Sequence, residues 1–290
     1  MVLSLCMPTN GIAEWVFPAL DSIYASDVNR DMFEVIVTDN GHNEAFEREM
    51  FLYADKHSNL TYKKTNAFMF DNQLETLKLA KGDFFKFVNH RSVWLPGRLQ
   101  YMIDFLTEYE LEQPVIYFSN GVMGWGPTSK KYDSFDSFVG DLGVYGTWTS
   151  GVGIWKSKYE EIMKNYKYDR ISPHSGILFG DRKNNQYIIN DKYWMKEIDL
   201  DHSKKGKYDL YKAFALDEFI IIINLYRDGD ITAETLLRVK ESFKKFLISL
   251  YRDFNIEKKG CSYDLNGFSK YVNIFFDEKD IIREAQNDTL

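Results

Sequence analysis

The first hundred residues alternate short apolar runs with amphipathic segments, and this alternation restricts the fold more than any other feature of the chain. The apolar runs end in turn residues, which predicts strands at 2–6, 33–37, 60–63 and 83–88. Between them, apolar residues at helical spacing predict helices at 13–25, 43–57 and 71–80, and a further helix after Pro96. Strands that alternate with helices predict an α/β fold with a mostly parallel, doubly wound sheet. Such sheets bind ligands at the carboxyl ends of their strands.

The pattern changes after about residue 114. A strand is predicted at 115–118, a long loop rich in Gly, Ser and Asp at 120–146, and another strand within 147–154. A helix is expected from Lys156 onward.

The C-terminal part of the chain is predicted to be helical. Residues 210–254 contain two helical patterns separated by Asp228-Gly229-Asp230, and Thr232 is expected to cap the second. An apolar stripe in that second helix predicts packing onto the rest of the protein. A homodimer face and peripheral contact with a membrane are the alternatives.

Charge and cysteine content argue against several classes of protein. The net charge of −7 disfavours a nucleic-acid binder, which is usually basic. Cys6 and Cys261 form neither a zinc-ligand spacing nor a disulfide framework, which fits a reducing cytoplasm. The first residues do not have the pattern of a signal peptide. The longest aliphatic run, at 219–223, is far shorter than the ~20 residues that span a bilayer. We therefore expect a cytoplasmic protein.

Three segments of the first hundred residues match, in order and in spacing, the motifs of one enzyme family. Two are strand ends, at 5–11 and 35–41, and the third runs from Asp71-Asn72 through 80–84 to 94–99. Together they resemble the family-two bacterial glycosyltransferases over roughly residues 1–105. The resemblance implies a GT-A fold over residues 1–200, with a donor half up to about 105 and an acceptor half after it. Residues 201–290 form a helical C-terminal region in this interpretation.

The resemblance places a nucleotide donor at the first two strand ends. A nucleotide base needs a fixed acceptor for its imide N–H, and the carboxylate of Asp39 matches the family's acceptor. Pro8 and Thr9 close the first turn, where backbone groups and the Thr hydroxyl can reach the base and ribose. The remaining residues matched to donor binding are Asn10, Asn40, Asn72, Asn89 and His90. The alternative is that 39–41 is an ordinary turn, which Asp, Asn and Gly favour.

The chain departs from the family where its Asp-x-Asp motif holds a divalent cation on the donor diphosphate. These positions are occupied by Asn89-His90-Arg91. Magnesium and manganese prefer hard oxygen ligands, and a cationic Arg91 repels them. In one hypothesis Arg91 replaces the metal, because guanidinium is permanently charged and binds phosphate oxygens in pairs. In the other, the chain is a degenerate binding module and Arg91 pairs with a surface carboxylate.

We therefore predict no metal and no other cofactor. The alternative is a manganese or magnesium ion recruited by a carboxylate of the predicted loop, from Asp133, Asp136 or Asp141.

The general base is expected in the segment 169–175. The family inverts the anomeric centre by direct displacement and needs one group to accept the proton of the acceptor hydroxyl. His174 lies about where the family has its Asp, and an ordinary histidine pKa near 6.5 suits a base at neutral pH. Asp169 is the competing candidate. In the third interpretation His174 caps the following segment and neither residue is the base.

The resemblance implies that a sugar is transferred from a nucleoside diphosphate, a UDP-sugar, to a hydroxyl of a bacterial surface glycan. Capsule, lipopolysaccharide and teichoic-acid assembly are the processes in which the family acts. The expected partners are the nucleotide sugar and a glycan or lipid-linked glycan, at the inner face of the membrane. A nucleotidyltransferase is one rival, but 7–11 lacks its Gly-rich loop with Lys or Arg. A non-catalytic module that binds glycans or nucleotides is the other.

Overall fold

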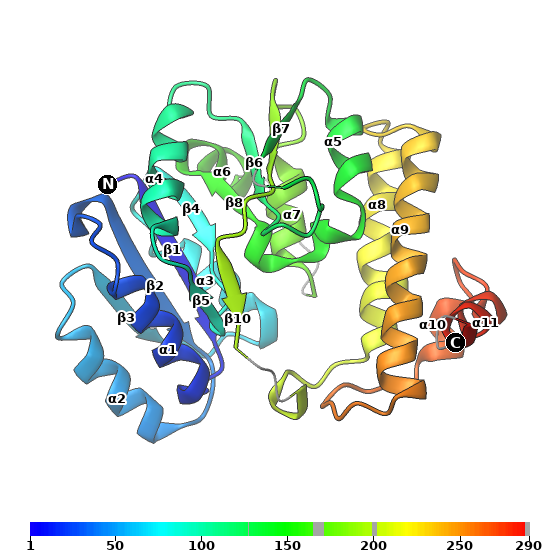
Figure 1. The fold of residues 1–290 in the computed structure, drawn as a ribbon, viewed down its shortest axis with the longest axis horizontal. Coiled ribbons are helices and arrows are strands. Elements are labelled where there is room, and N and C mark those ends of the chain that lie inside the picture. The colour runs from blue at the N-terminus through cyan, green and yellow to red at the C-terminus, as the bar shows by residue number, and fades with distance from the viewer. Residues whose placement is uncertain (127, 165–170, 199–201, 288–290) are drawn as a thin grey trace. The chain divides into compact units, whose positions relative to one another are not determined.

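The computed structural model describes residues 1–126, 128–164, 171–198 and 202–287, and the chain forms two compact units (Figure 1). The first contains residues 1–133 and 148–198. The second contains residues 134–147 and the chain after Ile198. Among the described residues, no helix is both long enough and apolar enough to cross a membrane.

The first unit is built on a five-stranded sheet. Its strand order is β3–β2–β1–β4–β8, in which β1 to β4 run parallel and β8 runs antiparallel to β4. The strands are β1 (Leu3–Thr9), β2 (Phe33–Asp39), β3 (Leu60–Lys64), β4 (Phe84–Phe87) and β8 (Gly153–Trp155). The helices between them are α1 (Ala13–Tyr24), α2 (Glu44–Ala54), α3 (Asn72–Leu77) and α4 (Arg98–Glu108). The α/β fold and the mostly parallel sheet predicted from the sequence are confirmed.

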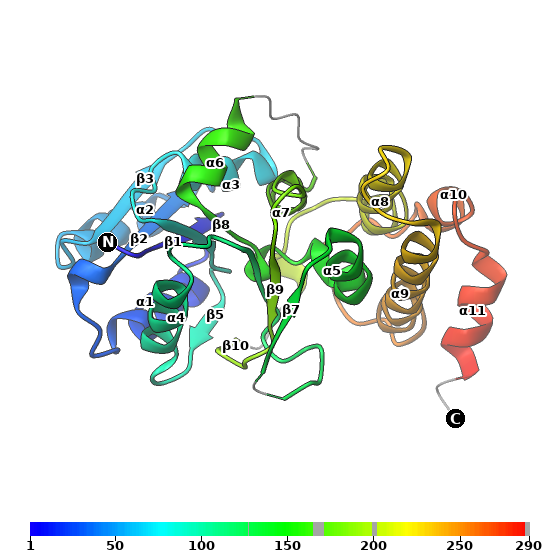
Figure 2. The ribbon, with the colours of Figure 1, turned by 90° about the horizontal axis from the view of Figure 1, so that it is seen from above.

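Helices cover both faces of this sheet. Seen from above, α1 and α4 lie on one face and α3 lies on the other (Figure 2). All seven residues of β2 are buried, which agrees with the consecutive apolar residues Val35, Ile36 and Val37 at its centre. The carboxyl ends of β1 and β2 are in register, with Thr9 opposite Asp39. The turns after both strands therefore lie at one edge.

Two smaller sheets complete the first unit. In one, β5 (Ser92–Trp94) pairs antiparallel with β10 (Met195–Glu197). In the other, β9 (Tyr187–Asn190) lies between β6 (Val115–Phe118) and β7 (Ser129–Tyr132), parallel to the first and antiparallel to the second. Two helices, α6 (Lys156–Met163) and α7 (Pro173–Gly180), lie in the chain between β8 of the central sheet and β9.

The long loop predicted at 120–146 is wrong in part, because the segment contains β7 and the helix α5 (Phe135–Leu142). The first three residues of β7 are polar and exposed, and pairing with β9 makes them a strand despite their composition. Helix α5 has apolar residues at positions 135, 138, 139 and 142, which is helical spacing, and Ser134 accepts a hydrogen bond from Ser137 N at its start. The strand predicted within 147–154 is also shorter, since a 3-10 turn at Thr149–Gly151 precedes β8.

The second unit is helical. It contains α5, α8 (Glu218–Arg227), α9 (Ala233–Tyr251), α10 (Phe268–Val272) and α11 (Glu278–Asn287). The predicted break between α8 and α9 and the predicted cap are confirmed, since the Thr232 side chain accepts a hydrogen bond from Thr235 N at 3.2 Å. Within this unit α9 packs against α5, α8 and α11, which buries Val239, Phe243 and Leu247.

Candidate donor site

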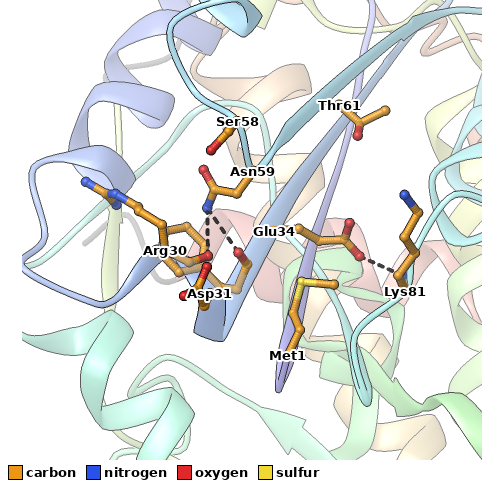
Figure 3. A pocket seen from close by; sticks show the side chains of 9 residues that line it. Met1, Arg30, Asp31, Glu34, Ser58, Asn59, Thr61 and Lys81 are labelled. Carbon is orange, nitrogen blue, oxygen red and sulfur yellow. Dashed lines mark hydrogen bonds between the residues drawn. The ribbon is translucent and has the colours of Figure 1, made fainter.

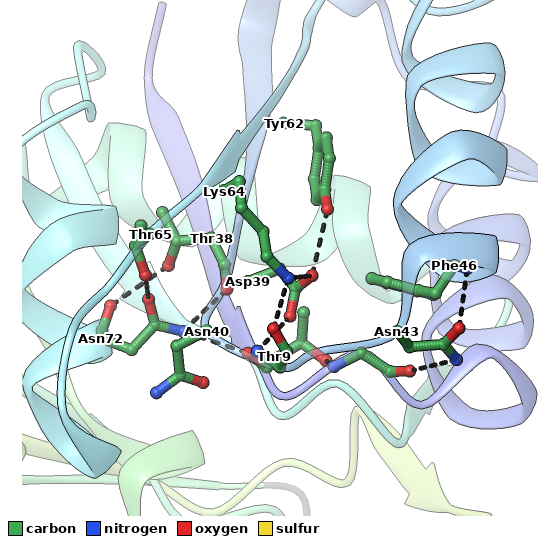
Figure 4. Close-up of polar contacts among 12 residues, drawn as sticks. Thr9, Thr38, Asp39, Asn40, Asn43, Phe46, Tyr62, Lys64, Thr65 and Asn72 are labelled. Carbon is green, nitrogen blue, oxygen red and sulfur yellow. Dashed lines mark hydrogen bonds and ion pairs between the residues drawn. The ribbon is translucent and has the colours of Figure 1, made fainter.

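Asn72, the first residue of α3, ties together the carboxyl ends of β1 and β2 (Figure 4). Its amide nitrogen Nδ2 donates to the carbonyl oxygens of Thr9 at 3.1 Å and Thr38 at 2.8 Å. Its Oδ1 accepts a hydrogen bond from Thr65 Oγ1 at 2.8 Å. Both amide hydrogens are therefore used inside the protein. In this arrangement Asn72, predicted to bind the donor, shapes the edge rather than donating to a ligand.

Asp39 ends β2 with a fully buried carboxylate that already has three partners (Figure 4). Oδ1 accepts a hydrogen bond from Gly41 N at 2.7 Å. Oδ2 accepts one from Tyr62 Oη at 3.1 Å and lies 2.8 Å from Lys64 Nζ. A carboxylate offers about four acceptor positions, so these three partners leave one position for a further hydrogen-bond donor. Because the Lys64 side chain is 29% exposed, its movement would open a path to that position.

Tyr62 and Lys64 are site residues that the sequence analysis missed. They alternate along β3, and the register places Tyr62 opposite Val37 and Lys64 opposite Asp39. Burial, followed by the charge of Asp39, raises the pKa of Tyr62 above its ordinary value, so its hydroxyl stays protonated and can donate. Two polar residues at alternate positions of a strand next to Asp39 were the available signal.

Thr9 and His90 connect the end of β1 with the turn after β4. Thr9 Oγ1 lies 2.8 Å from His90 Nδ1 and accepts a hydrogen bond from Gly11 N at 3.1 Å. The His90 ring meets the Trp15 ring edge-on, with centroids 5.2 Å apart. Loss of solvent, followed by the neighbouring charge of Arg91, lowers the pKa of His90 to about 3. His90 is therefore neutral at physiological pH. The other predicted residues of the first turn are the partly buried Pro8 and the exposed Asn10.

Asn40 continues the edge beyond Asp39. Its backbone N–H donates to Thr9 O at 3.1 Å. Its side-chain Nδ2 donates to the carbonyl oxygens of Ala67 and Met69, each at 3.0 Å. Asn40 therefore joins the first turn to the segment that follows β3.

A carboxylate from β10, which the sequence analysis did not identify, lies beside the turn after β4. Pairing of β10 with β5 brings Glu197 next to Arg91, whose Nε lies 3.3 Å from Glu197 Oε2. Asn89 Nδ2 donates to the other oxygen, Oε1, at 3.4 Å. The turn itself has no carboxylate, and a strand 106 residues away supplies one beside it. The pairing of Arg91 with a carboxylate, one of the two predicted alternatives, is present.

These residues do not fit a divalent metal ion. Among the described residues, no three side chains of His, Cys, Asp or Glu are grouped so that they could hold one. The carboxylate of Glu197 is engaged by a guanidinium, which repels a cation. Of the predicted recruiting residues in the second unit, Asp136 accepts a hydrogen bond from Thr232 N and Asp141 pairs with Arg238. Asp133 is exposed.

His174 lies in the first turn of α7, after Ser172 at the N-cap position, and is 4% exposed. Its Nδ1 lies 3.2 Å from Gln73 Oε1, and Gln73 Nε2 donates to Thr149 Oγ1 at 3.4 Å. Since Gln73 follows Asn72 on α3, this contact connects His174 to the helix end that ties β1 to β2. Asp169, the competing candidate for the base, lies outside the described residues.

A polar hollow of about 320 Å³ lies at the opposite edge of the central sheet (Figure 3). Its lining residues surround the amino ends of β1, β2 and β3: Met1, Arg30, Asp31, Phe33, Glu34, Ser58, Asn59, Thr61 and Lys81. Glu34 Oε1 accepts hydrogen bonds from Ser4 Oγ at 2.7 Å and from Lys81 N at 2.6 Å. Because doubly wound sheets bind ligands at the carboxyl ends of their strands, this hollow is not the candidate donor site.

The fold is similar to that of solved structures of other proteins. No family model and no curated protein sequence matches the chain. Among solved structures, S. aureus TarS 1–349 in complex with UDP-GlcNAc matches with a TM-score of 0.57 at 16% identity, over 99% of this chain and 80% of that one. The complex of TarS 1–349 with UDP matches with a TM-score of 0.55 at 17% identity, over 93% of this chain and 75% of that one. The mannosyltransferase PcManGT from Pyrobaculum calidifontis, in complex with GDP-Man and Mn²⁺, matches with a TM-score of 0.54 at 13% identity. The match covers 99% of this chain and 86% of that one. At these identities the similarity establishes the fold, and the GT-A-like fold class predicted from the sequence is confirmed.

Proposed function

We propose that the protein is a glycosyltransferase that moves a sugar from a nucleoside diphosphate, a UDP-sugar, to a hydroxyl of a bacterial surface glycan. The observation that carries this proposal is the carboxyl edge of β1 and β2, where Asn72 ties the strand ends and Thr9 lies opposite Asp39. Solved structures of the same fold hold UDP, UDP-GlcNAc or GDP-Man, which supports a nucleotide-sugar donor. The acceptor class follows from the resemblance of the sequence motifs to enzymes of capsule, lipopolysaccharide or teichoic-acid assembly.

In this proposal two groups of residues along the edge bind two different parts of the donor, the nucleoside and the diphosphate. The nucleoside lies at the ends of β1 and β2, with Thr9, Asp39 and Asn40, and with Pro8 and Asn10 in the first turn. The diphosphate lies toward the turn after β4, where the uncharged His90 and the guanidinium of Arg91 meet it. Arg91 uses Nε for Glu197, and within the described part of the chain no partner is recorded for its two terminal nitrogens, which we assign to the phosphate oxygens.

The reaction is a direct displacement with inversion. The acceptor oxygen bonds to the anomeric carbon as its proton passes to the base, and the bond from that carbon to the diphosphate oxygen breaks. The electron pair leaves with the nucleoside diphosphate, whose growing negative charge Arg91 stabilises. His174 is the proposed base and Asp169 the competing one. No step of this proposal requires a metal ion.

A non-catalytic binding module is the second candidate, and the ion pair between Arg91 and Glu197 favours it. In such a module the guanidinium neutralises a carboxylate instead of a leaving group. The two candidates differ in hydrolysis of the donor without acceptor, because an enzyme of this kind releases nucleoside diphosphate slowly and a module does not.

The test is a thermal-shift panel of UDP, GDP, UDP-GlcNAc and GDP-Man, each with and without manganese. A ligand at about 100 times its dissociation constant adds about 2.7 kcal/mol to the free energy of unfolding, which is readily measured. We expect stabilisation by a UDP compound, unchanged by manganese. Stabilisation by none of the four compounds would contradict a nucleotide-sugar donor.

A further inference from the structure

Phe68 is an aromatic side chain held out into solvent beside the candidate donor site. Its side chain is 64% exposed, and it lies in the segment between β3 and α3. In the described part of the chain, no aromatic or cationic group is recorded against its ring. The segment begins at the edge itself, because Thr65 N donates to Asp39 O at 2.8 Å.

The backbone around Phe68 is fixed on both sides. The carbonyl oxygens of Ala67 and Met69 both accept hydrogen bonds from Asn40 Nδ2, and the carbonyl of Phe68 accepts one from Asp71 N at 3.0 Å. Met69 has a φ of +46°, a left-handed conformation that is uncommon for a residue other than glycine. Such conformations persist only where the surroundings enforce them, and they concentrate at functional sites. The protein therefore holds the backbone at Phe68 in a defined place, although most of the residue's surface is exposed.

The order of the strands indicates which part of a bound donor would lie next to the Phe68 ring. Phe68 follows β3, at one end of the order β3–β2–β1–β4, whereas Arg91 follows β4 at the other end of these four strands. In a nucleoside diphosphate, the base is likewise at the opposite end from the phosphates. A ligand with its diphosphate toward Arg91 and its ribose near Thr9 therefore has its base toward the segment that follows β3.

We propose that the Phe68 ring is the surface on which the planar base of the nucleotide donor stacks. Any planar base can stack on an aromatic side chain, whichever hydrogen-bonding groups the base carries. The ring therefore adds affinity for the nucleotide, while Asp39 determines which base is preferred. This inference rests on the proposed function, since it needs a nucleotide at this edge.

The experiment compares UDP and inorganic pyrophosphate by calorimetry on the whole protein and its Phe68→Ala, Phe68→Tyr and Leu111→Ala variants. Removing a stacked aromatic weakens binding by about 5- to 150-fold, so we expect a loss of this size for UDP with Phe68→Ala. Pyrophosphate has no base, and its affinity should stay the same. Phe68→Tyr keeps the ring and should bind UDP within about twofold of the parent. Leu111, which is 94% exposed and follows α4, is the matched apolar control and should change neither affinity.

Two results would overturn the inference while leaving the proposed function in place. One is unchanged UDP affinity in Phe68→Ala, and the other is an equal loss of UDP and pyrophosphate, which would mean that the variant disturbs the segment as a whole. A parent protein that binds neither UDP nor GDP would overturn the proposed function, and this inference with it.

Discussion

The two ends of the carboxyl edge are constructed differently. At the β1–β2 end, Asn72 donates to the carbonyl oxygens of Thr9 and Thr38. The carboxylate of Asp39 is held by Gly41, Tyr62 and Lys64, so every contact lies within the first seventy-two residues. At the β4 end, Arg91 and Asn89 depend on Glu197, which β10 brings from far along the chain. The polar groups at the first end hold one another in place without a ligand. At the second end, the guanidinium of Arg91 forms an ion pair with the carboxylate of Glu197. In the proposed function, the first end fixes the nucleotide and the second meets the charge of the leaving group.

The largest expected effect tests the charge at the β4 end. Arg91→Ala should lower kcat by about a hundredfold to a thousandfold, because it removes a fixed cation from a developing negative charge. Arg91→Lys should rescue only part, since the paired hydrogen bonds of guanidinium are lost. The measurement is sugar transfer under saturating donor, first in EDTA and then with manganese added back. Activity that disappears with chelation and returns with manganese would show that Arg91 does not replace a metal.

Glu197→Gln is the matched variant for this test. It keeps an oxygen for Arg91 Nε and removes the negative charge beside it, so donor affinity should rise or stay constant. If it lowers kcat as strongly as Arg91→Ala, the carboxylate itself takes part in the reaction.

The next effect separates chemistry from binding. His174→Ala and His174→Asn should lower kcat by about a hundredfold or more if His174 is the base, with unchanged affinity for UDP. Asp169→Asn is the companion variant, and the larger loss identifies the base. Calorimetry with UDP supplies the control, because a variant that binds UDP normally has kept the edge intact. Normal turnover in all three variants would place the base elsewhere.

How far the sequence could predict this edge follows from the same comparison. The strands and the motifs at Thr9, Asp39 and Asn72 lie close along the chain, so apolar periodicity and turn residues were enough to place them together. Glu197 could not be placed, because its position depends on antiparallel pairing between β10 and β5, two three-residue strands with little sequence signal. Helix α5 was missed although its apolar spacing was present, since Gly, Ser and Asp dominated the composition of that stretch.

A smaller effect tests whether Asp39 contacts the base or only shapes the turn. Asp39→Ala should weaken UDP binding by about 1–3 kcal/mol in either case, because Gly41, Tyr62 and Lys64 lose their acceptor. Lys64→Met decides between the two, since it clears the path to the carboxylate while Gly41 N and Tyr62 still hold Asp39. We expect UDP affinity measured by calorimetry to stay the same or to rise. A loss equal to that of Asp39→Ala would mean that the ion pair shapes the site and that Asp39 does not meet the base.

The smallest effect concerns His90, which joins the two ends of the edge. Its pKa in the folded protein is about 3, below the ordinary value of about 6.5 for an unfolded chain. Between these values the unfolded state binds more protons, so the free energy of unfolding falls as the pH falls through this window and is unaffected above it. One such group contributes at most about 1.4 kcal/mol per pH unit, and a partly buried ring contributes less. Urea unfolding at pH 4.5, 5.5 and 7.5 should therefore show a steeper decline for the parent than for His90→Gln. Equal declines would mean that His90 titrates normally, and the uncharged contact assigned to it at the diphosphate would then be wrong.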